Sequence, residues 1–278
     1  MMDLFTKTTF DCAKLITQAY STSFTLGIKT LDKSLHEPIY AIYGFVRYAD
    51  EIVDTFHQWD RATLLNRFEK DTFQSLEEGI SLNPVLHAFQ SVVNAYKIDH
   101  EYIKAFLYSM RMDLTETTYD QQKYETYIYG SAEVVGLMCL KVFCQHSNAD
   151  FDHLKTAACK LGSAFQKVNF LRDMKSDHEE RGRVYFPKVD YTQFNDHIKK
   201  SIETDIQSDF DQAYEGIVNL PDNARMGVYL AYVYYLQLFE KIKGASFQAV
   251  KSERIRIPNP TKLLLLTKTY FQFRLKTI

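Results

Sequence analysis

Two groups of aspartates stand at spacings that would let them bind a metal ion. Asp50 and Asp54 are four residues apart, and Asn169, Asp173 and Asp177 also step by four. Side chains four residues apart lie on one face of an α-helix, so each group would present its oxygens together. Mg²⁺ takes oxygen ligands and binds through one or two carboxylates together with water and substrate phosphates. Two such helices facing each other are therefore predicted to hold a diphosphate group through bridging Mg²⁺.

Solvated helix faces are the alternative explanation, because like charges four residues apart cost a helix only a few tenths of a kcal/mol. The surroundings of Asp50 and Asp54 argue against it. Phe45, Val53 and Phe56 are among the apolar residues around them. Carboxylates near an apolar interior require a counter-ion, so a buried cation site is favoured over a solvated face.

Arginines accompany both groups of aspartates. Arg47 precedes the first group, Arg172 lies within the second, Arg181 and Arg183 follow it, and Arg256 comes near the C-terminus. Beside a metal–diphosphate site they would neutralise a leaving group, whereas taken singly they are surface charges. No GxxxxGK[ST], GxGxxG or GxSxG sequence is present, so the common nucleotide-binding loops and the serine-hydrolase turn find no support.

Long helices are predicted to position these residues. The chain has only 10 glycines and 6 prolines, with no proline between Pro84 and Pro187, and apolar residues recur at three- and four-residue spacing over 157–171. Asn83-Pro84 is typical of a helix start, and residues 229–239 are predicted as helix despite their strand propensity. We expect one all-α domain over residues 1–278, with about ten helices centred near residues 14, 45, 68, 90, 107, 135, 163, 208, 233 and 268.

The composition narrows the functional class. The 19 tyrosines and 20 phenylalanines supply a large core or wall an apolar cavity. A net charge of −2 gives no reason to expect a nucleic-acid partner. Neither the four cysteines nor the eight histidines show metal-site spacing. Cysteines without such spacing are typical of reduced thiols in a cytoplasmic protein. The first ten residues predict no targeting leader, and the longest strongly apolar stretch, 227–239, is too short for a membrane span.

Several motifs, in order along the chain, resemble the squalene/phytoene synthase family. That family has a DxxxD motif preceded by an arginine, and an NxxRDxxxD motif that leads into RGRxYxP. RYADEIVD at 47–54 and NFLRDMKSDHEERGRVYFP at 169–187 match both motifs. Further matches are YSTSF at 20–24, YIYGSAEVVG at 127–136 and RIP at 256–258. The resemblance implies a single-domain isoprenoid-synthase bundle of helices around a central apolar cavity.

The resemblance also implies roles for individual residues. Two or three Mg²⁺ ions, with Mn²⁺ as an alternative, would be bound by Asp50, Glu51, Asp54, Asn169, Asp173 and Asp177. Diphosphate would be held by Ser21, Ser23, Arg47, Asn169, Arg172, Arg183 and Arg256. The cavity wall would include Tyr20, Phe24, Tyr43, Phe165 and Tyr234. Tyr127 would stand near the reacting carbons, as a catalytic residue together with the four motif aspartates, Arg47 and Arg172.

The implied activity is head-to-head (1′–1) condensation of two prenyl diphosphates through a cyclopropylcarbinyl diphosphate. Phytoene made from two geranylgeranyl diphosphates, in carotenoid biosynthesis and without NADPH, is favoured. Three features support it: the Asp50-Glu51 reading of the first motif, tyrosine at position 20, and the lack of an apolar C-terminal tail. Squalene or dehydrosqualene synthesis from two farnesyl diphosphates is the alternative. A non-catalytic assembly protein of the same fold is a remote one, because such relatives typically lose motif aspartates.

Two positions depart from the family pattern, and one segment is a candidate for contact with a membrane. Glu133 replaces a glycine on a helix expected to line the cavity, and Lys175-Ser176 replace the usual glycine-glutamate. Lipid substrates imply peripheral contact with the inner face of a membrane. Residues 262–278, with leucines and aromatics among lysines, are the candidate segment; the alternative is a helix packed on the bundle. The sequence predicts no oligomeric state.

Overall fold

The computed structural model describes residues 2–145 and 147–275. Within them the chain is helical apart from connections and an isolated β-bridge between Thr118 and Val184. The helices, in chain order, are α1 Met2–Tyr20, α2 Thr22–Lys29, α3 Lys33–Asp54, α4 Arg61–Glu78, α5 Pro84–Tyr96, α6 His100–Thr115, α7 Gln121–Ile128, the π-helix η1 Tyr129–Glu133, α8 Val134–Cys144, α9 Phe151–Arg172, α10 Met174–Arg181, the 3₁₀-helix η2 Tyr191–Gln193, α11 Asp196–Ile217, α12 Asp222–Lys243, α13 Phe247–Ser252 and α14 Asn259–Arg274.

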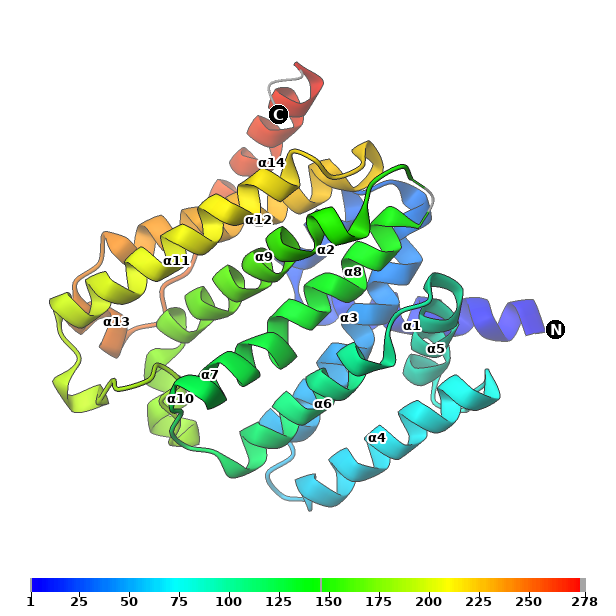
Figure 1. Ribbon diagram of the computed structural model, residues 1–278, viewed down its shortest axis with the longest axis horizontal. Coiled ribbons are helices and arrows are strands. Elements are labelled where there is room, and N and C mark those ends of the chain that lie inside the picture. The colour runs from blue at the N-terminus through cyan, green and yellow to red at the C-terminus, as the bar shows by residue number, and fades with distance from the viewer. Residues whose placement is uncertain (1, 146, 276–278) are drawn as a thin grey trace.

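The longer helices lie side by side in a bundle (Figure 1). Helices α11, α9, α8, α6 and α4 follow one another across the face shown, and each packs against the next. Behind them α3 packs against α5, α6 and α8, while α12 packs against α9, α2 and α14. This is the predicted all-α, single-domain bundle. Because α8 contacts both α3 and α9, the two helices that carry the aspartate motifs lie on either side of it.

Short polar side chains explain where many of these helices begin. The residue just before the helix accepts a backbone N–H of the first turn at Asp32, Asp60, Asn83, Asp99, Asp120, Asp150 and Asn195. Such a cap is worth about 1 kcal/mol. The helix start predicted at Asn83-Pro84 is confirmed, with Asn83 Oδ1 accepting from the N–H of Val85 at 3.0 Å.

Each of the ten predicted helix centres falls within a helix, and residues 229–239 are helical. The short helices α2, α10 and α13 were not expected, because they begin where the backbone leaves helical geometry. Ser21 is extended (φ −146°, ψ 107°) and caps α2. Asp173 (φ −102°, ψ 9°) separates α9 from α10, so the second motif is not one uninterrupted helix.

Helices α7, η1 and α8 form a continuous helical stretch, Gln121–Cys144, which is the one candidate membrane span among the described residues. From the sequence, residues 227–239 were considered for a membrane span, and this stretch was not. By length and composition alone this helix could cross a membrane, but half of its most apolar window is buried inside the fold. A Cβ at Gly130 would lie 2.4 Å from the carbonyl oxygen of Ala105. Such close approach to α6 is typical of a core helix.

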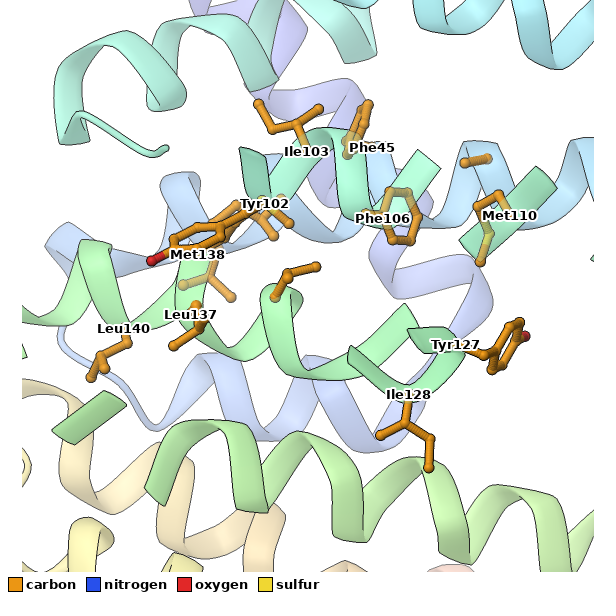
Figure 2. Close-up of a cluster of buried hydrophobic side chains, with 14 of the residues drawn as sticks. Phe45, Tyr102, Ile103, Phe106, Met110, Tyr127, Ile128, Leu137, Met138 and Leu140 are labelled. Carbon is orange, nitrogen blue, oxygen red and sulfur yellow. The ribbon is translucent and has the colours of Figure 1, made fainter. Parts of the chain in front are cut away.

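Phenylalanine stacking dominates the core beside α3. Phe45 is fully buried and stacks on Phe89, with ring centroids 3.8 Å apart, and on Phe68 at 5.4 Å. Figure 2 shows Phe45 next to Phe106, with ring centroids 5.4 Å apart, and Tyr127 on a neighbouring helix of the same cluster. Much of the aromatic content therefore serves packing, and the part that lines a cavity is a minority, as described next.

Candidate active site

A cavity of about 990 Å³ opens between α2, α3, α8, α9, α11 and α12. This volume is at the upper end of the range typical of small-molecule sites. One part of the wall carries the motif aspartates and arginines, and the remainder is mainly apolar. Ten tyrosines and phenylalanines line it, so only a minority of the 19 tyrosines and 20 phenylalanines face this cavity. Every predicted site residue lines this cavity except Glu51.

The first aspartate motif occupies the last turns of α3. Asp50 Oδ2 lies 3.9 Å from Arg47 Nη1, and Arg47 also pairs with Glu51. Burial, followed by the negative charge of Asp54, raises the pKa of Asp50 to about 7. Glu51 therefore holds Arg47 in this structure. Asp50 is left with too little positive charge nearby to balance its own negative charge.

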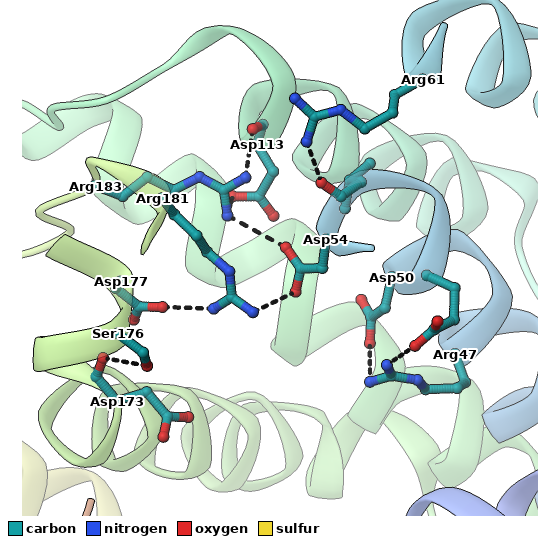
Figure 3. A network of polar contacts seen from close by, with 12 residues as sticks. Arg47, Asp50, Asp54, Arg61, Asp113, Asp173, Ser176, Asp177, Arg181 and Arg183 are labelled. Atoms are coloured by element: carbon teal, nitrogen blue, oxygen red, sulfur yellow. Dashed lines mark hydrogen bonds and ion pairs between the residues drawn. The ribbon is translucent and has the colours of Figure 1, made fainter. Parts of the chain in front are cut away.

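The second motif faces the first from the junction of α9 and α10 (Figure 3). Hydrogen bonds preserve its four-residue step across the break: the N–H of Asp173 donates to the carbonyl of Asn169 at 2.8 Å, and that of Asp177 to the carbonyl of Asp173 at 2.9 Å. Asp173 pairs with Arg172 and, at 2.8 Å, with Arg254. The interruption therefore leaves the ligand spacing intact.

Two arginines, one on each side of Gly182, point at the aspartates: Arg181 ends α10, and Arg183 follows the turn at Gly182. Gly182 adopts the left-handed conformation (φ +65°) that ends α10, which glycine takes without a steric penalty. Arg181 then bridges the motifs, 2.6 Å from Asp177 and 3.3 Å from Asp54. Arg183 lies 3.4 Å from Asp54. Burial raises the pKa of Asp177 to about 6, although Arg181 opposes the rise.

Asp113 on α6 belongs to the same cluster, and the sequence motifs did not identify it. Its carboxylate accepts hydrogen bonds from Tyr127 at 2.7 Å and Tyr185 at 3.1 Å, and lies 3.2 Å from Arg183. Burial raises the pKa of Asp113 to about 6, with Arg183 opposing. One signal was available in the sequence: Asp113 lies three residues after Met110, on the buried stripe of α6.

The oxygens present suit a metal ion that shares its ligands with substrate. Among residues 2–145 and 147–275, no three acidic, histidine or cysteine side chains form a ready-made metal site. Asp50 and Asp54 instead stand on one wall, and Asp173 and Asp177 on the other (Figure 3). Repulsion by Asp54 contributes to the raised pKa of Asp50, which a cation would relieve. The residues therefore fit Mg²⁺ bound partly through water and phosphate.

The residues expected to bind diphosphate differ in how far they are already engaged. Arg183 is buried and donates to the backbone oxygen of Asp113 at 2.6 Å. Asn169 Oδ1 accepts from Tyr235 at 3.4 Å, and Ser21 caps α2. Ser23, Arg172 and Arg256 also reach the cavity wall. Arg183 is thus fixed by protein partners before any ligand binds.

Aromatic rings cover the wall beside the charged end. Phe165 stacks on Tyr235 with centroids 3.9 Å apart, and Phe24 lies between Tyr235 and Tyr43, at 6.4 and 5.7 Å. Burial raises the pKa of Tyr43 to about 12. The hydroxyl of Tyr234 donates to the carbonyl of Lys262 at 2.8 Å. Its neighbour Tyr235, which no sequence motif identified, makes the aromatic contacts with Phe165 and Phe24 instead.

Tyr20 stands near the first motif: its ring lies under the Arg47 guanidinium, 4.4 Å from the centroid. Glu133, which replaces a glycine of the family pattern, is not part of the cavity wall. Burial raises the pKa of Glu133, and Lys160 and Cys159 oppose the rise. The departure at 175–176 is mild as well, because Ser176 donates to the carbonyl of Asp173 at 3.0 Å. Neither substitution removes an oxygen from the facing aspartates.

Comparison with known proteins agrees with this geometry. The sequence model described as Squalene/phytoene synthase matches residues 17–261. The chain is 27% identical to phytoene synthase 1 of Zea mays over 95% of this chain and 68% of that protein. It is 26% identical to phytoene synthase of Arthrospira platensis, over 92% of this chain and 91% of that one. These similarities indicate a prenyltransferase-type enzyme.

Solved structures share the fold. A dehydrosqualene synthase in complex with ligand superposes with a TM-score of 0.81 at 22% identity, over 97% of this chain and 98% of that one. A squalene synthase from Alicyclobacillus acidocaldarius gives 0.75 at 20% identity, over 86% and 94%. With the motifs gathered at one cavity and the match to most of its length, the chain belongs to the squalene/phytoene synthase family.

Proposed function

We propose that this protein condenses two geranylgeranyl diphosphates head to head (1′–1) to phytoene, through a cyclopropylcarbinyl diphosphate, in carotenoid biosynthesis. The observation that carries the proposal is the division of one cavity into a charged end and an apolar, aromatic remainder. A prenyl diphosphate has the same division. Its diphosphate fits the charged end, and its hydrocarbon chain fits the remainder.

The family is generally dependent on divalent metal, and we propose Mg²⁺, with Mn²⁺ as an alternative. Asp50, Asp54, Asp173 and Asp177 would hold it, with Asn169 in support. When bound, the ion supplies positive charge that favours departure of diphosphate. These residues provide oxygens from two facing walls, which is the arrangement that a bridging diphosphate requires.

The chain's own cations and rings carry the rest of the proposed mechanism. Arg47, Arg172 and Arg256 line the charged end and would hold the diphosphate oxygens through charge-assisted hydrogen bonds. Ionisation leaves an allylic cation in the apolar part of the cavity. Faces of Phe165 and Tyr235 lie there, and an aromatic face stabilises a cation by about 0.5–2 kcal/mol.

The length of the prenyl diphosphate substrate distinguishes the proposed activity from its nearest alternative. The two curated relatives described above are phytoene synthases, which supports two C20 substrates. The solved structures described above are a dehydrosqualene synthase and a squalene synthase, and at this identity they support the fold alone. Loss of a proton would end the reaction as phytoene, so NADPH is not required.

Product analysis tests the proposal. Purified protein with Mg²⁺ is incubated with the C20 diphosphate or the C15 diphosphate, each with and without NADPH. The expected result is a C40 hydrocarbon from the C20 substrate, independent of NADPH. A C30 product from the C15 substrate alone would contradict the C20 proposal and support dehydrosqualene or squalene synthesis. Biological activity that survives Asp50→Ala and Asp173→Ala, without hydrocarbon formation, would instead support a non-catalytic role.

A membrane surface is the proposed source of these lipid substrates, and α14 is the proposed contact. Leu265 and Thr269 are buried against the bundle, so one side of the helix is packed as the alternative reading expected. Leu263, Leu264 and Phe271 are exposed. Residues 276–278 of the predicted segment lie outside the described residues. Co-sedimentation with anionic liposomes at low salt is the expected result, and its absence would contradict this contact.

A further inference from the structure

Asp113 holds the hydroxyl of Tyr127 inside the cavity wall. The Tyr127 hydroxyl donates to Asp113 Oδ2 at 2.7 Å. The other carboxylate oxygen, Oδ1, accepts from Tyr185 at 3.1 Å and lies 3.2 Å from Arg183 Nη1. The same guanidinium donates through Nη2 to the backbone oxygen of Asp113 at 2.6 Å. Both carboxylate oxygens are therefore committed to named partners.

The direction of the Tyr127 hydrogen bond follows from charge. Burial raises the pKa of Asp113 to about 6, but the Arg183 guanidinium 3.2 Å from Oδ1 opposes the rise and favours the ionised carboxylate. An ionised carboxylate accepts hydrogen bonds and donates none. Tyr127 must therefore be the donor, and its single hydroxyl hydrogen is engaged by Asp113. The lone pairs of its oxygen are not used in that bond, and Tyr127 is part of the cavity wall.

The ring of Tyr127 is fixed as well as its hydroxyl. Its centroid lies 5.0 Å from that of Tyr185, 5.4 Å from Tyr119 and 5.9 Å from Phe170. The side chain is buried, yet it forms part of the cavity wall. The phenol therefore has little freedom to rotate its oxygen away.

We propose that Asp113 is the positioning residue of Tyr127, which it holds so that the phenol oxygen presents lone pairs to the reacting carbons. The proposal rests on the proposed function, in which a carbocation forms in this cavity. A dipole already oriented toward developing charge stabilises it without reorganising during the reaction. A hydroxyl that turned its hydrogen to the cavity would oppose the same charge.

Asp113→Asn makes a sharp test, because the surroundings determine how the amide lies. Arg183 and Tyr185 both donate toward Oδ1, so the amide oxygen will take that position. The amide NH₂ then replaces Oδ2 and donates to Tyr127, which reverses its hydroxyl. We expect kcat to fall by about 10²-fold, as on loss of one oriented donor, with KM for the prenyl diphosphate changed less than about threefold.

Tyr127→Phe tests whether this loss passes through the phenol. It should lower kcat less than Asp113→Asn does, and the double variant should have the kcat of Tyr127→Phe, because no hydroxyl remains to be reversed. Multiplied losses in the double variant would overturn the proposal. Tyr119→Phe is the matched control, since its buried hydroxyl has no hydrogen-bond partner among the described residues; its kcat should match the unsubstituted protein.

A measurement without turnover separates this proposal from the proposed function. In protein with isotope-labelled tyrosines, NMR should show a downfield, slowly exchanging hydroxyl proton that Tyr127→Phe removes and Asp113→Asn shifts upfield. Its absence would overturn the role of Asp113 whatever the enzyme makes. If the proton is present but neither the C15 nor the C20 substrate yields hydrocarbon, the proposed function fails while the positioning of Tyr127 stands.

Discussion

Helix α9 borders two clusters of buried charged residues, which shift the pKa values of their carboxyl groups in opposite directions. The cavity cluster comprises Asp50, Asp54, Asp113, Asp173 and Asp177 with their arginines. The interhelix cluster joins α9 to α11 and comprises Lys160, Ser163, Lys167, Asp205 and Asp209. In the cavity cluster, burial raises the pKa of Asp50 to about 7 and of Asp113 to about 6. In the interhelix cluster, the pKa of Asp209 is lowered.

The number and placement of donors explain this difference. Asp209 is buried, which alone would raise its pKa. Lys167 at 2.7 Å, Lys160 at 2.9 Å and Ser163 at 2.7 Å outweigh that effect. Among the described residues Asp50 has one ion-pair partner, Arg47 at 3.9 Å, and Arg181 acts on it from a greater distance. Asp209, which is paired with two lysines, links α9 to α11. Asp50, which has too little positive charge around it, can instead bind a cation that arrives with the ligand.

The largest effect is expected for Asp50→Asn. It removes a proposed metal ligand and should lower hydrocarbon formation about 10³-fold, or about 4 kcal/mol. The same change removes a carboxylate whose charged form is disfavoured by the fold, so thermal unfolding should occur at an equal or higher temperature. Asp205→Asn is the control in the other cluster, where a 59% exposed partner of Lys167 is neutralised; it should retain activity. Full activity in Asp50→Asn would break the contrast.

Asp209→Asn should give the reverse result. It leaves the buried Lys167 and the half-buried Lys160 without their shared anion, and breaking a buried pair costs about 3–5 kcal/mol. The free energy of unfolding, measured in urea, should fall by the lower end of that range. Activity per folded molecule should persist, since Asp209 is not part of the cavity wall. Should this variant fail to fold, Ser163→Ala removes one hydrogen bond to the Asp209 carboxylate and should cost about 1.5–3 kcal/mol.

Ligand-induced stabilisation is expected to follow the cavity cluster alone. Mg²⁺ with inorganic diphosphate at about 100 times the dissociation constant should add about 2.7 kcal/mol, roughly 5–10 °C in melting temperature for a chain of this size. The shift should be lost in Asp50→Asn and kept in Asp205→Asn. An equal shift in both variants would place the ligand elsewhere. Mg²⁺ alone should give a smaller shift, because the protein holds no closed metal site among its described residues.

The sequence was most informative where chemistry depends on fixed spacing along one helix. Asp50 and Asp54, or Arg181 and Asp177, are brought together by local geometry, so their pairing follows from the motifs. Asp113 has no such signal beyond one aspartate on an apolar stripe, since its partners come from α7 and from the turn after α10. Contacts between distant segments depend on packing, and for the same reason Tyr235 could not be chosen over Tyr234 in advance.

Glu133 shows the same limit at the level of a helix face. Its motif placed it on the helix that lines the cavity, and that helix does line it, through Ser131 and Val135 among others. The π-helical segment Tyr129–Glu133 changes the residue spacing there, because each turn holds an extra residue compared with an α-helix. The carboxylate is therefore directed toward Cys159 and Lys160. Knowing that a helix lines the cavity therefore does not tell which of its side chains reach the cavity where the regular spacing is interrupted.

The smallest predicted effect concerns acid, and it isolates the interhelix cluster. Because the pKa of Asp209 is lower in the folded protein than its ordinary value of 3.8, the unfolded chain binds a proton more readily. The stabilisation is therefore complete above about pH 4 and is lost as pH falls through the folded value. Unfolding free energies of the unsubstituted protein and Asp209→Asn, compared from pH 7 down to pH 3, should converge at the acid end. A constant difference would mean that Asp209 stabilises the α9–α11 contact by its shape and packing, with its charge contributing nothing.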